Sequence, residues 1–129
     1  MKATLTNYRQ SPRKVRLVAN AVKGKTVEQA DIELSYMPKR AADPIKKLIK
    51  SAVANAAQAG IDTSSLIVKN IEVNQGLVMK RFMPRAMGSA KPIRKKMSHV
   101  DVVLSEAVAK PAKKTVAKAV KKEVTPKKK

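Results

Sequence analysis

The chain has 129 residues, of which 29 are Lys or Arg and 9 are Asp or Glu, so its formal net charge is +20. Self-repulsion from so large an excess opposes a compact free state, and the composition therefore predicts a polyanionic partner, most commonly nucleic acid. The absence of cysteine excludes disulfides and cysteine-based metal sites, and only three aromatic residues leave little means of stacking single-stranded bases.

The N-terminal third has the periodicity of a strand followed by two helices. A short strand is predicted over residues 3–9. The next element is a helix with Ser11 as its N-cap and Pro12 at its first position. Valines and an alanine at three- and four-residue spacing continue this helix until Gly24 ends it. Thr26 then begins a second helix with a capping box.

A third and longest helix has its apolar face over residues 45–56 and ends at Gly60. Two starts are compatible with the sequence. Pro44 can lie in the first turn with Asp43 as the cap, or it can kink a helix that begins near Pro38. The alanine content of this helix predicts close packing against its neighbours.

The last third changes to the two-residue period of strands. Residues 66–74 and 99–106 are rich in β-formers, and the second of these segments alternates between apolar and polar positions. Two strands around one long segment predict a β-hairpin, and Pro84, Gly88 and Pro92 predict that its tip is irregular. The sequence thus indicates an α+β fold.

The hairpin segment, residues 73–100, contains no acid but many lysines and arginines. Acids gather instead around the second helix, so the two signs of charge are segregated along the chain. We interpret the segment as an RNA-contacting arm whose methionines fill gaps between nucleotides. The alternative is a disordered loop whose methionines belong to the core.

Residues 109–129 differ from the 1–108 domain, because they hold nine lysines, one acid and few large apolar residues. We expect a flexible arm there, although valines at every fourth position would also suit a helix induced on RNA. No segment is apolar for long enough to cross a bilayer, and the first residues resemble neither a signal nor a transit peptide. A cytoplasmic protein without a membrane partner is therefore expected.

Four stretches together resemble the bacterial large-subunit ribosomal protein twenty-two family. They are Ser11-Pro12-Arg13-Lys14-Val15-Arg16-Leu17-Val18-Ala19 with Gly24-Lys25, then Ser51-Ala52-Val53-Ala54-Asn55-Ala56, then Met79-Lys80-Arg81-Phe82-Met83-Pro84-Arg85-Ala86-Met87-Gly88-Ser89-Ala90, and finally Ser98-His99-Val100-Asp101-Val102-Val103-Leu104. The resemblance spans nearly all of residues 1–106, and its hairpin signature is specific. The lysine-rich tail exceeds the common core of the family.

The resemblance implies three helices packed on a small antiparallel sheet with a long protruding β-hairpin. It also implies binding to large-subunit ribosomal RNA, help in assembly, neighbouring ribosomal proteins as partners, and a hairpin tip that lines the exit tunnel beside the nascent peptide. Charge and resemblance together predict the RNA-binding residues Arg9, Arg13, Lys14, Arg16, Lys23, Lys25, Lys80, Arg81, Arg85, Lys91, Arg94, Lys95, Lys96 and His99. The tunnel-lining tip is predicted as Met83, Pro84, Arg85, Ala86, Met87, Gly88, Ser89, Ala90 and Lys91.

Other function classes fit the sequence less well. His99 is the only histidine and has no cysteine to join it, so neither a zinc site nor a catalytic site is predicted. We expect no cofactor, no enzymatic activity and no stable homo-oligomer. The main alternative is a histone-like architectural protein, which combines helices with basic β-arms that bend duplex DNA.

Overall fold

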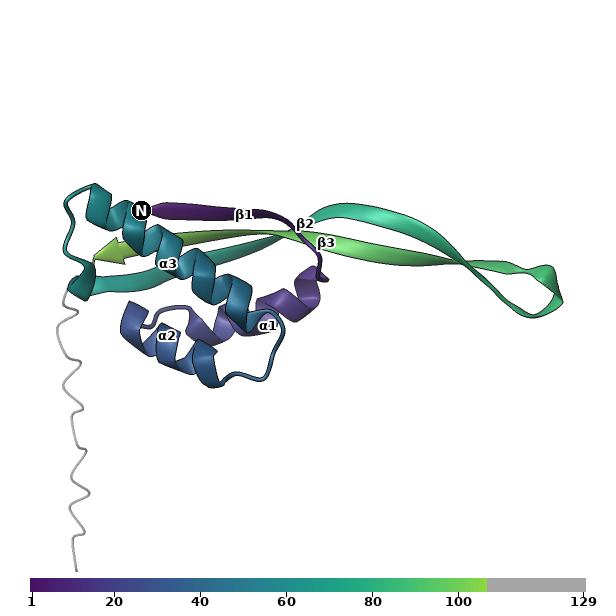
Figure 1. Cartoon of the computed structure of the whole chain (residues 1–129), viewed down its shortest axis with the longest axis horizontal. Helices are drawn as coiled ribbons and strands as arrows, with labels where there is room; N and C mark the ends of the chain where they lie inside the picture. Colours follow the sequence, from purple (N-terminus) through teal and green to yellow (C-terminus); the bar gives the residue numbers. More distant parts are fainter. Residues whose placement is uncertain (107–129) are drawn as a thin grey trace, which may run out of the picture.

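The sheet of this protein has three antiparallel strands in the order β1–β3–β2, as Figure 1 shows for the computed structural model, which describes residues 1–106. The strands are β1 over Lys2–Tyr8, β2 over Leu66–Pro84 and β3 over Ala90–Glu106. β3 is central because it pairs with both others, for example Ala3 with Val102 and Ile71 with Val102. The predicted boundary at residue 108 and the predicted 109–129 tail lie outside the described residues.

Three helices cover one side of the sheet (Figure 1). They are α1 over Pro12–Val22, α2 over Val27–Tyr36 and α3 over Ala42–Gln58. Gly24 has a φ of +81°, which ends α1 at little cost as predicted. Thr26 Oγ1 accepts a hydrogen bond from the Gln29 N–H at 3.3 Å, which is one half of the predicted capping box. None of the helices in residues 1–106 is long and apolar enough to cross a membrane.

The start of α3 decides between the two predicted arrangements. The helix begins at Ala42, so Pro44 lies in its first turn and does not kink a longer helix. Asp43 as the cap was wrong, because Ala41 occupies that position and Asp43 lies inside the first turn. There its carboxylate is placed favourably toward the positive end of the helix dipole.

The core lies between the helices and one face of the sheet. Val100 and Val102 are fully buried and Leu104 is 2% exposed, whereas the alternate residues between them are half-buried on the other face. The predicted alternation is therefore confirmed. The helices contribute the apolar stripes expected from their periodicity, with these residues buried: Val15, Val18, Ala19, Val22, Ala30, Leu34, Ile45, Leu48, Ile49, Ala52 and Ala56.

The hairpin formed by β2 and β3 extends well beyond the helices (Figure 1). The irregular tip predicted from Pro84, Gly88 and Pro92 is confirmed only for residues 85–89, where Met87 and Gly88 have φ of +58° and +69°. Regular pairing extends farther than predicted, through Phe82 with Pro92 to Pro84 with Ala90. Beyond the end of β1 the hairpin has only two strands, so each is an edge strand. A proline there can face solvent with the side that lacks an N–H, and no hydrogen bond between strands is lost. Arg85 N–H then closes the tip by donating to Ser89 O at 2.8 Å.

The root of the hairpin, where it leaves the domain, is marked by interrupted pairing. The register of β2 against β3 shifts between Gln75 and Val78, and that of β1 shifts between Leu5 and Tyr8. The ring of His99 fills this root, because a Cβ added at Gly76 would lie 2.8 Å from His99 Nε2. Only glycine therefore allows this close approach of β2 to the imidazole.

Candidate nucleic-acid interface

A surface cavity of about 790 Å³ lies at the root of the hairpin and is lined by cationic side chains. The start of α1, the loop before α3 and the part of β3 that returns from the tip toward the domain meet there (Figure 1). The lining residues are Arg9, Gln10, Ser11, Arg13, Lys14, Arg40, Arg94, Lys95 and Lys96. We call this site the root cavity.

The root cavity joins two groups of predicted RNA-binding residues that are remote in sequence. Arg9, Arg13 and Lys14 come from the N-terminal segment, and residues 94–96 come from β3. No acid is among its lining residues. All four ion pairs within residues 1–106 lie elsewhere and involve Lys2, Lys25, Lys46 and Lys50. The cations of the root cavity are thus left without an internal counterion, as a phosphate-binding surface requires.

Backbone geometry adds to this preference for anions. Ser11 holds the N-cap position of α1, but its side chain makes no capping hydrogen bond, so its hydroxyl can serve a ligand in the root cavity. The positive end of the α1 dipole points into the same region. The N-terminus of this 11-residue helix therefore reinforces the charge of the surrounding arginines.

Arg40 is a member of the root cavity that was missed from the sequence. Arg40 lies in the loop before α3, next to Lys39. Two neighbouring cations in a loop give no indication that the loop lies beside β3. The Tyr8 hydroxyl donates a hydrogen bond to Arg40 O at 3.1 Å, which fixes the loop beside the end of β1. Burial raises the pKa of Tyr8, an effect that the Arg40 guanidinium partly offsets and Asp43 adds to.

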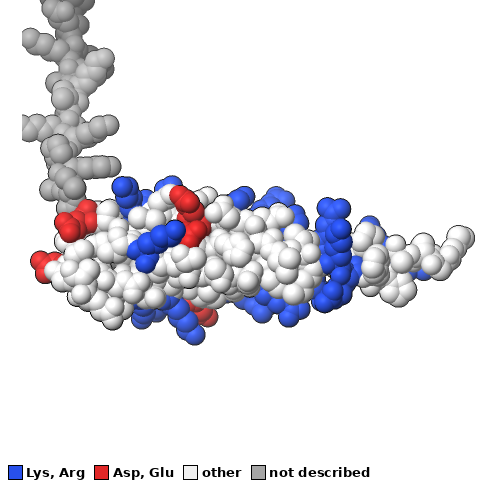
Figure 2. All heavy atoms as spheres, turned by 90° about the horizontal axis from the view of Figure 1, so that it is seen from above, with Lys and Arg blue, Asp and Glu red and all other residues white. Residues whose placement is uncertain are grey.

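The hairpin continues the basic surface outward. Figure 2 shows Lys and Arg around its root and proximal part, whereas Asp and Glu appear only over the body of the domain. Lys80 is paired directly with Arg94 across the two strands, and both are exposed. Like charges opposite one another destabilise a hairpin in water. Phosphates between or beside them would remove this repulsion.

Three predicted RNA-binding residues have side-chain partners in other parts of the fold, whereas Arg81 contacts only its neighbour, with Nη1 donating to Lys80 O at 3.0 Å. Arg16 donates from Nε and Nη2 to Val73 O, at 3.1 and 2.8 Å, and so ties α1 to β2. Lys25 forms an ion pair with Glu33. His99 Nδ1 accepts a hydrogen bond from the Asn7 N–H at 3.2 Å. These contacts assign each residue a structural role, whereas Lys23, Lys80, Arg81, Arg85 and Lys91 are exposed and available for binding.

Every residue of the predicted tunnel-lining tip is exposed. Met87 is fully exposed and Met83 is 47% exposed, so the alternative that placed the hairpin methionines in the core is wrong for these two. Phe82 is 75% exposed beside them. Large apolar side chains this accessible indicate a surface meant for contact with another molecule.

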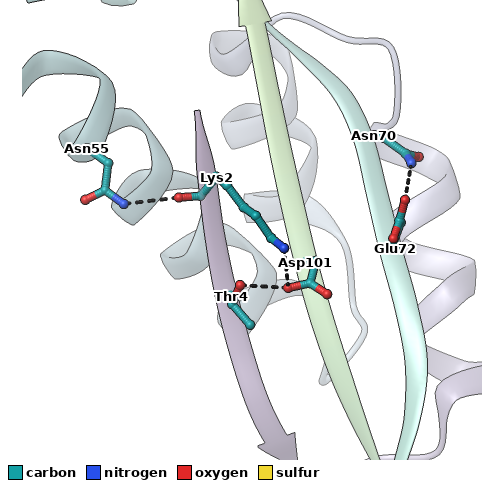
Figure 3. A network of polar contacts seen from close by, with 6 residues as sticks. All are labelled: Lys2, Thr4, Asn55, Asn70, Glu72 and Asp101. Atoms are coloured by element: carbon teal, nitrogen blue, oxygen red, sulfur yellow. Dashed lines mark hydrogen bonds and ion pairs between the residues drawn. The ribbon is translucent and has the colours of Figure 1, made fainter. Parts of the chain in front are cut away.

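The outer face of the sheet has a different character (Figure 3). Asp101 accepts a hydrogen bond from Thr4 Oγ1 at 2.7 Å and lies 3.7 Å from Lys2 Nζ, while Asn70 Nδ2 donates to Glu72 at 3.0 Å. Asn55 of α3 donates to the backbone oxygen of Lys2, which joins the helix to the edge of β1. Here both signs of charge neutralise each other, so this face lacks the unpaired positive charge of the root cavity.

Within residues 1–106 no group of three His, Asp or Glu side chains could hold a metal ion.

Comparison with known proteins matches residues 3–105 to the family model described as ribosomal protein L22p/L17e. A large ribosomal subunit protein uL22 of Pelobacter propionicus is 50% identical over 106 residues, covering 81% of this chain and 96% of that protein. Those of Myxococcus xanthus and Anaeromyxobacter sp. (strain Fw109-5) are 52% and 53% identical, with 95% and 74% of their lengths covered.

Proposed function

The chain belongs to the ribosomal protein L22p/L17e family, and on this premise we propose that its root cavity and hairpin bind large-subunit ribosomal RNA. As a family member it is a structural constituent of the large ribosomal subunit and not an enzyme. It therefore works in translation, in the ribosome of the bacterial cytoplasm, with ribosomal RNA and other ribosomal proteins around it. The family match does not favour the histone-like alternative.

The convergence of uncompensated cations in the root cavity is the observation that carries the RNA-binding proposal. Arg13 and Lys14 on α1, Arg40 before α3 and Arg94 on β3 line one cavity that includes no acid. A polyanion gains affinity there from release of its counterions. We include all fourteen predicted RNA-binding residues in the proposal, with Arg16, Lys25 and His99 acting through the internal contacts described above.

The RNA-binding proposal is tested by sedimentation of cell extract on a sucrose gradient with immunodetection of the chain. We expect the protein to migrate with large subunits and to remain there after a high-salt wash, because many phosphate contacts act together. Recovery only in slow fractions, or with nucleoid DNA, would contradict the proposal.

We also propose that the tip, residues 83–91, lies in the exit tunnel and contacts the nascent peptide. Support comes from its exposure and from its separation from the helices (Figure 1). The tip combines apolar side chains with Arg85 and Lys91, which suits a wall made partly of RNA and partly of protein. A single copy per particle is proposed as well, since a net charge of +20 opposes self-association.

The tunnel proposal predicts a specific crosslink. The chain has no cysteine, so Met87→Cys places one thiol at a fully exposed position of the tip. In ribosomes that carry this variant, we expect disulfide crosslinking to a cysteine in a stalled nascent peptide, detected as a shifted band on a non-reducing gel. Ala54→Cys, on the exposed side of α3, is the matched control and should give no such band. Equal crosslinking from both positions would contradict a tunnel location of the tip.

A further inference from the structure

One side chain in the root cavity does not fit a site built for phosphate alone. Gln10 Oε1 is buried and has no hydrogen-bond partner among the described residues, a condition that it shares there only with Ser98 Oγ. Gln10 lines the root cavity together with seven arginines and lysines, none of which donates a hydrogen bond to this oxygen. Its backbone is fixed between β1 and α1, because the Gln10 N–H donates to Tyr8 O at 2.8 Å.

A buried acceptor without a donor is unfavourable. Because Gln10 lines the root cavity, a turn of its side chain toward the cavity would present this oxygen to a donor that the ligand supplies. The nonbridging oxygens of a phosphodiester only accept hydrogen bonds and therefore cannot satisfy the amide oxygen. The ribose 2′-hydroxyl can donate, and it belongs to the same backbone as the phosphates that the cations attract. DNA has no hydroxyl at this position.

We propose that Gln10 Oε1 accepts a hydrogen bond from the 2′-hydroxyl of one RNA nucleotide whose neighbouring phosphates are bound by the cations of the root cavity. The arginines and lysines then supply affinity for any nucleic acid backbone, and Gln10 supplies the preference for RNA over DNA at this point. This inference rests on the proposed RNA-binding function and assigns one residue of the same cavity a specific role within it.

The test is analogue interference with a large-subunit ribosomal RNA transcript that carries random 2′-deoxy substitutions, bound by the full chain. We expect wild-type protein to reject transcripts with a 2′-deoxy nucleotide at one position, and Gln10→Met to lose this rejection. Met is close to Gln in length but has no amide acceptor. Loss of the bond should lower the affinity of the variant for unmodified RNA by about 5- to 10-fold.

Two controls separate the possible failures. Arg13→Ala should weaken binding while the rejected 2′-deoxy position remains, because it removes phosphate contact and leaves the Gln10 oxygen. If wild-type protein does not bind the transcript, the proposed function itself is wrong. An identical 2′-deoxy pattern for wild type and Gln10→Met would overturn only the role of Gln10. So would a difference seen only with inosine in place of guanosine, since the donor would then be a base amino group.

Discussion

Replacing Arg13, Arg40 and Arg94 together with Ala is expected to weaken binding of large-subunit ribosomal RNA by at least about 100-fold at moderate salt. These residues reach the root cavity from α1, the loop before α3 and β3. Each lost phosphate contact also lowers the slope of log affinity against log salt by about 0.7 to 0.9, so the triple variant should lose roughly 2 to 3. Filter binding across a salt series measures both quantities.

A matched control removes the same charge from elsewhere. Lys47, Lys50 and Lys69 lie on α3 and β2, outside the root cavity, and their replacement by Ala changes the net charge equally. We expect a clearly smaller loss of affinity from this control. Equal losses would mean that only total charge matters, and the root cavity would then have no special role. The free energy of unfolding of the triple arginine variant should stay within about 1 kcal/mol of wild type. The three side chains are exposed, and their removal only reduces repulsion between like charges.

The second large effect concerns folding. Leu104→Ala should lower the free energy of unfolding by about 2–5 kcal/mol, because it leaves a cavity in a closely packed core. Leu104 is 2% exposed and lies on the central strand, where it pairs with Val68. A loss of this size is a large part of the roughly 5–15 kcal/mol that stabilises a typical domain. Urea denaturation should show a lower midpoint with an unchanged slope.

Leu77→Ala is the matched substitution on the hairpin. Leu77 is 61% exposed and lies next to the register shift at the root, beyond the helices. We expect a change of at most about 0.5 kcal/mol, as is usual for surface positions. A destabilisation comparable to that of Leu104→Ala would show that the hairpin packs against the domain in solution, contrary to its separation in Figure 1.

Much of the fold was predictable because its helices and its core strand have regular hydrophobic periods. The ends of α1 followed from Pro12 and Gly24, whose backbone preferences are strong and local. The cap of α3 was not predictable in the same way. Ala41 has no side chain that marks a cap, whereas Asp43 does, so a sequence-based choice favours the wrong residue.

The extent of the hairpin was underestimated for a different reason. Pro84 and Pro92 normally indicate the end of pairing, but that rule depends on whether a strand has a neighbour on each side. Whether a strand has a neighbour on each side depends on the tertiary fold. Here β1 ends at Tyr8, so the part of the hairpin beyond it has only two strands. The prolines are therefore tolerated where the sequence alone predicted irregular backbone.

The candidate site was predicted in its chemistry but not in its assembly. Charge and the family resemblance together predicted which arginines and lysines bind RNA, and the resemblance predicted the tip. That Arg40 joins Arg13 and Arg94 depends on how the loop before α3 packs beside β1. The sequence likewise does not predict that the Gln10 amide oxygen lacks a hydrogen-bond partner, because a single glutamine between a strand and a helix belongs to no recognisable pattern.

The unbroken pairing from Val78–Lys96 to Pro84–Ala90 makes the reach of the hairpin adjustable only in discrete steps. One residue added to each strand would turn every side chain beyond it to the opposite face of the ribbon. Two residues added to each strand would restore the faces and advance the tip by roughly 6.6 Å. Natural or engineered length variants that keep the same faces should therefore differ by multiples of four residues.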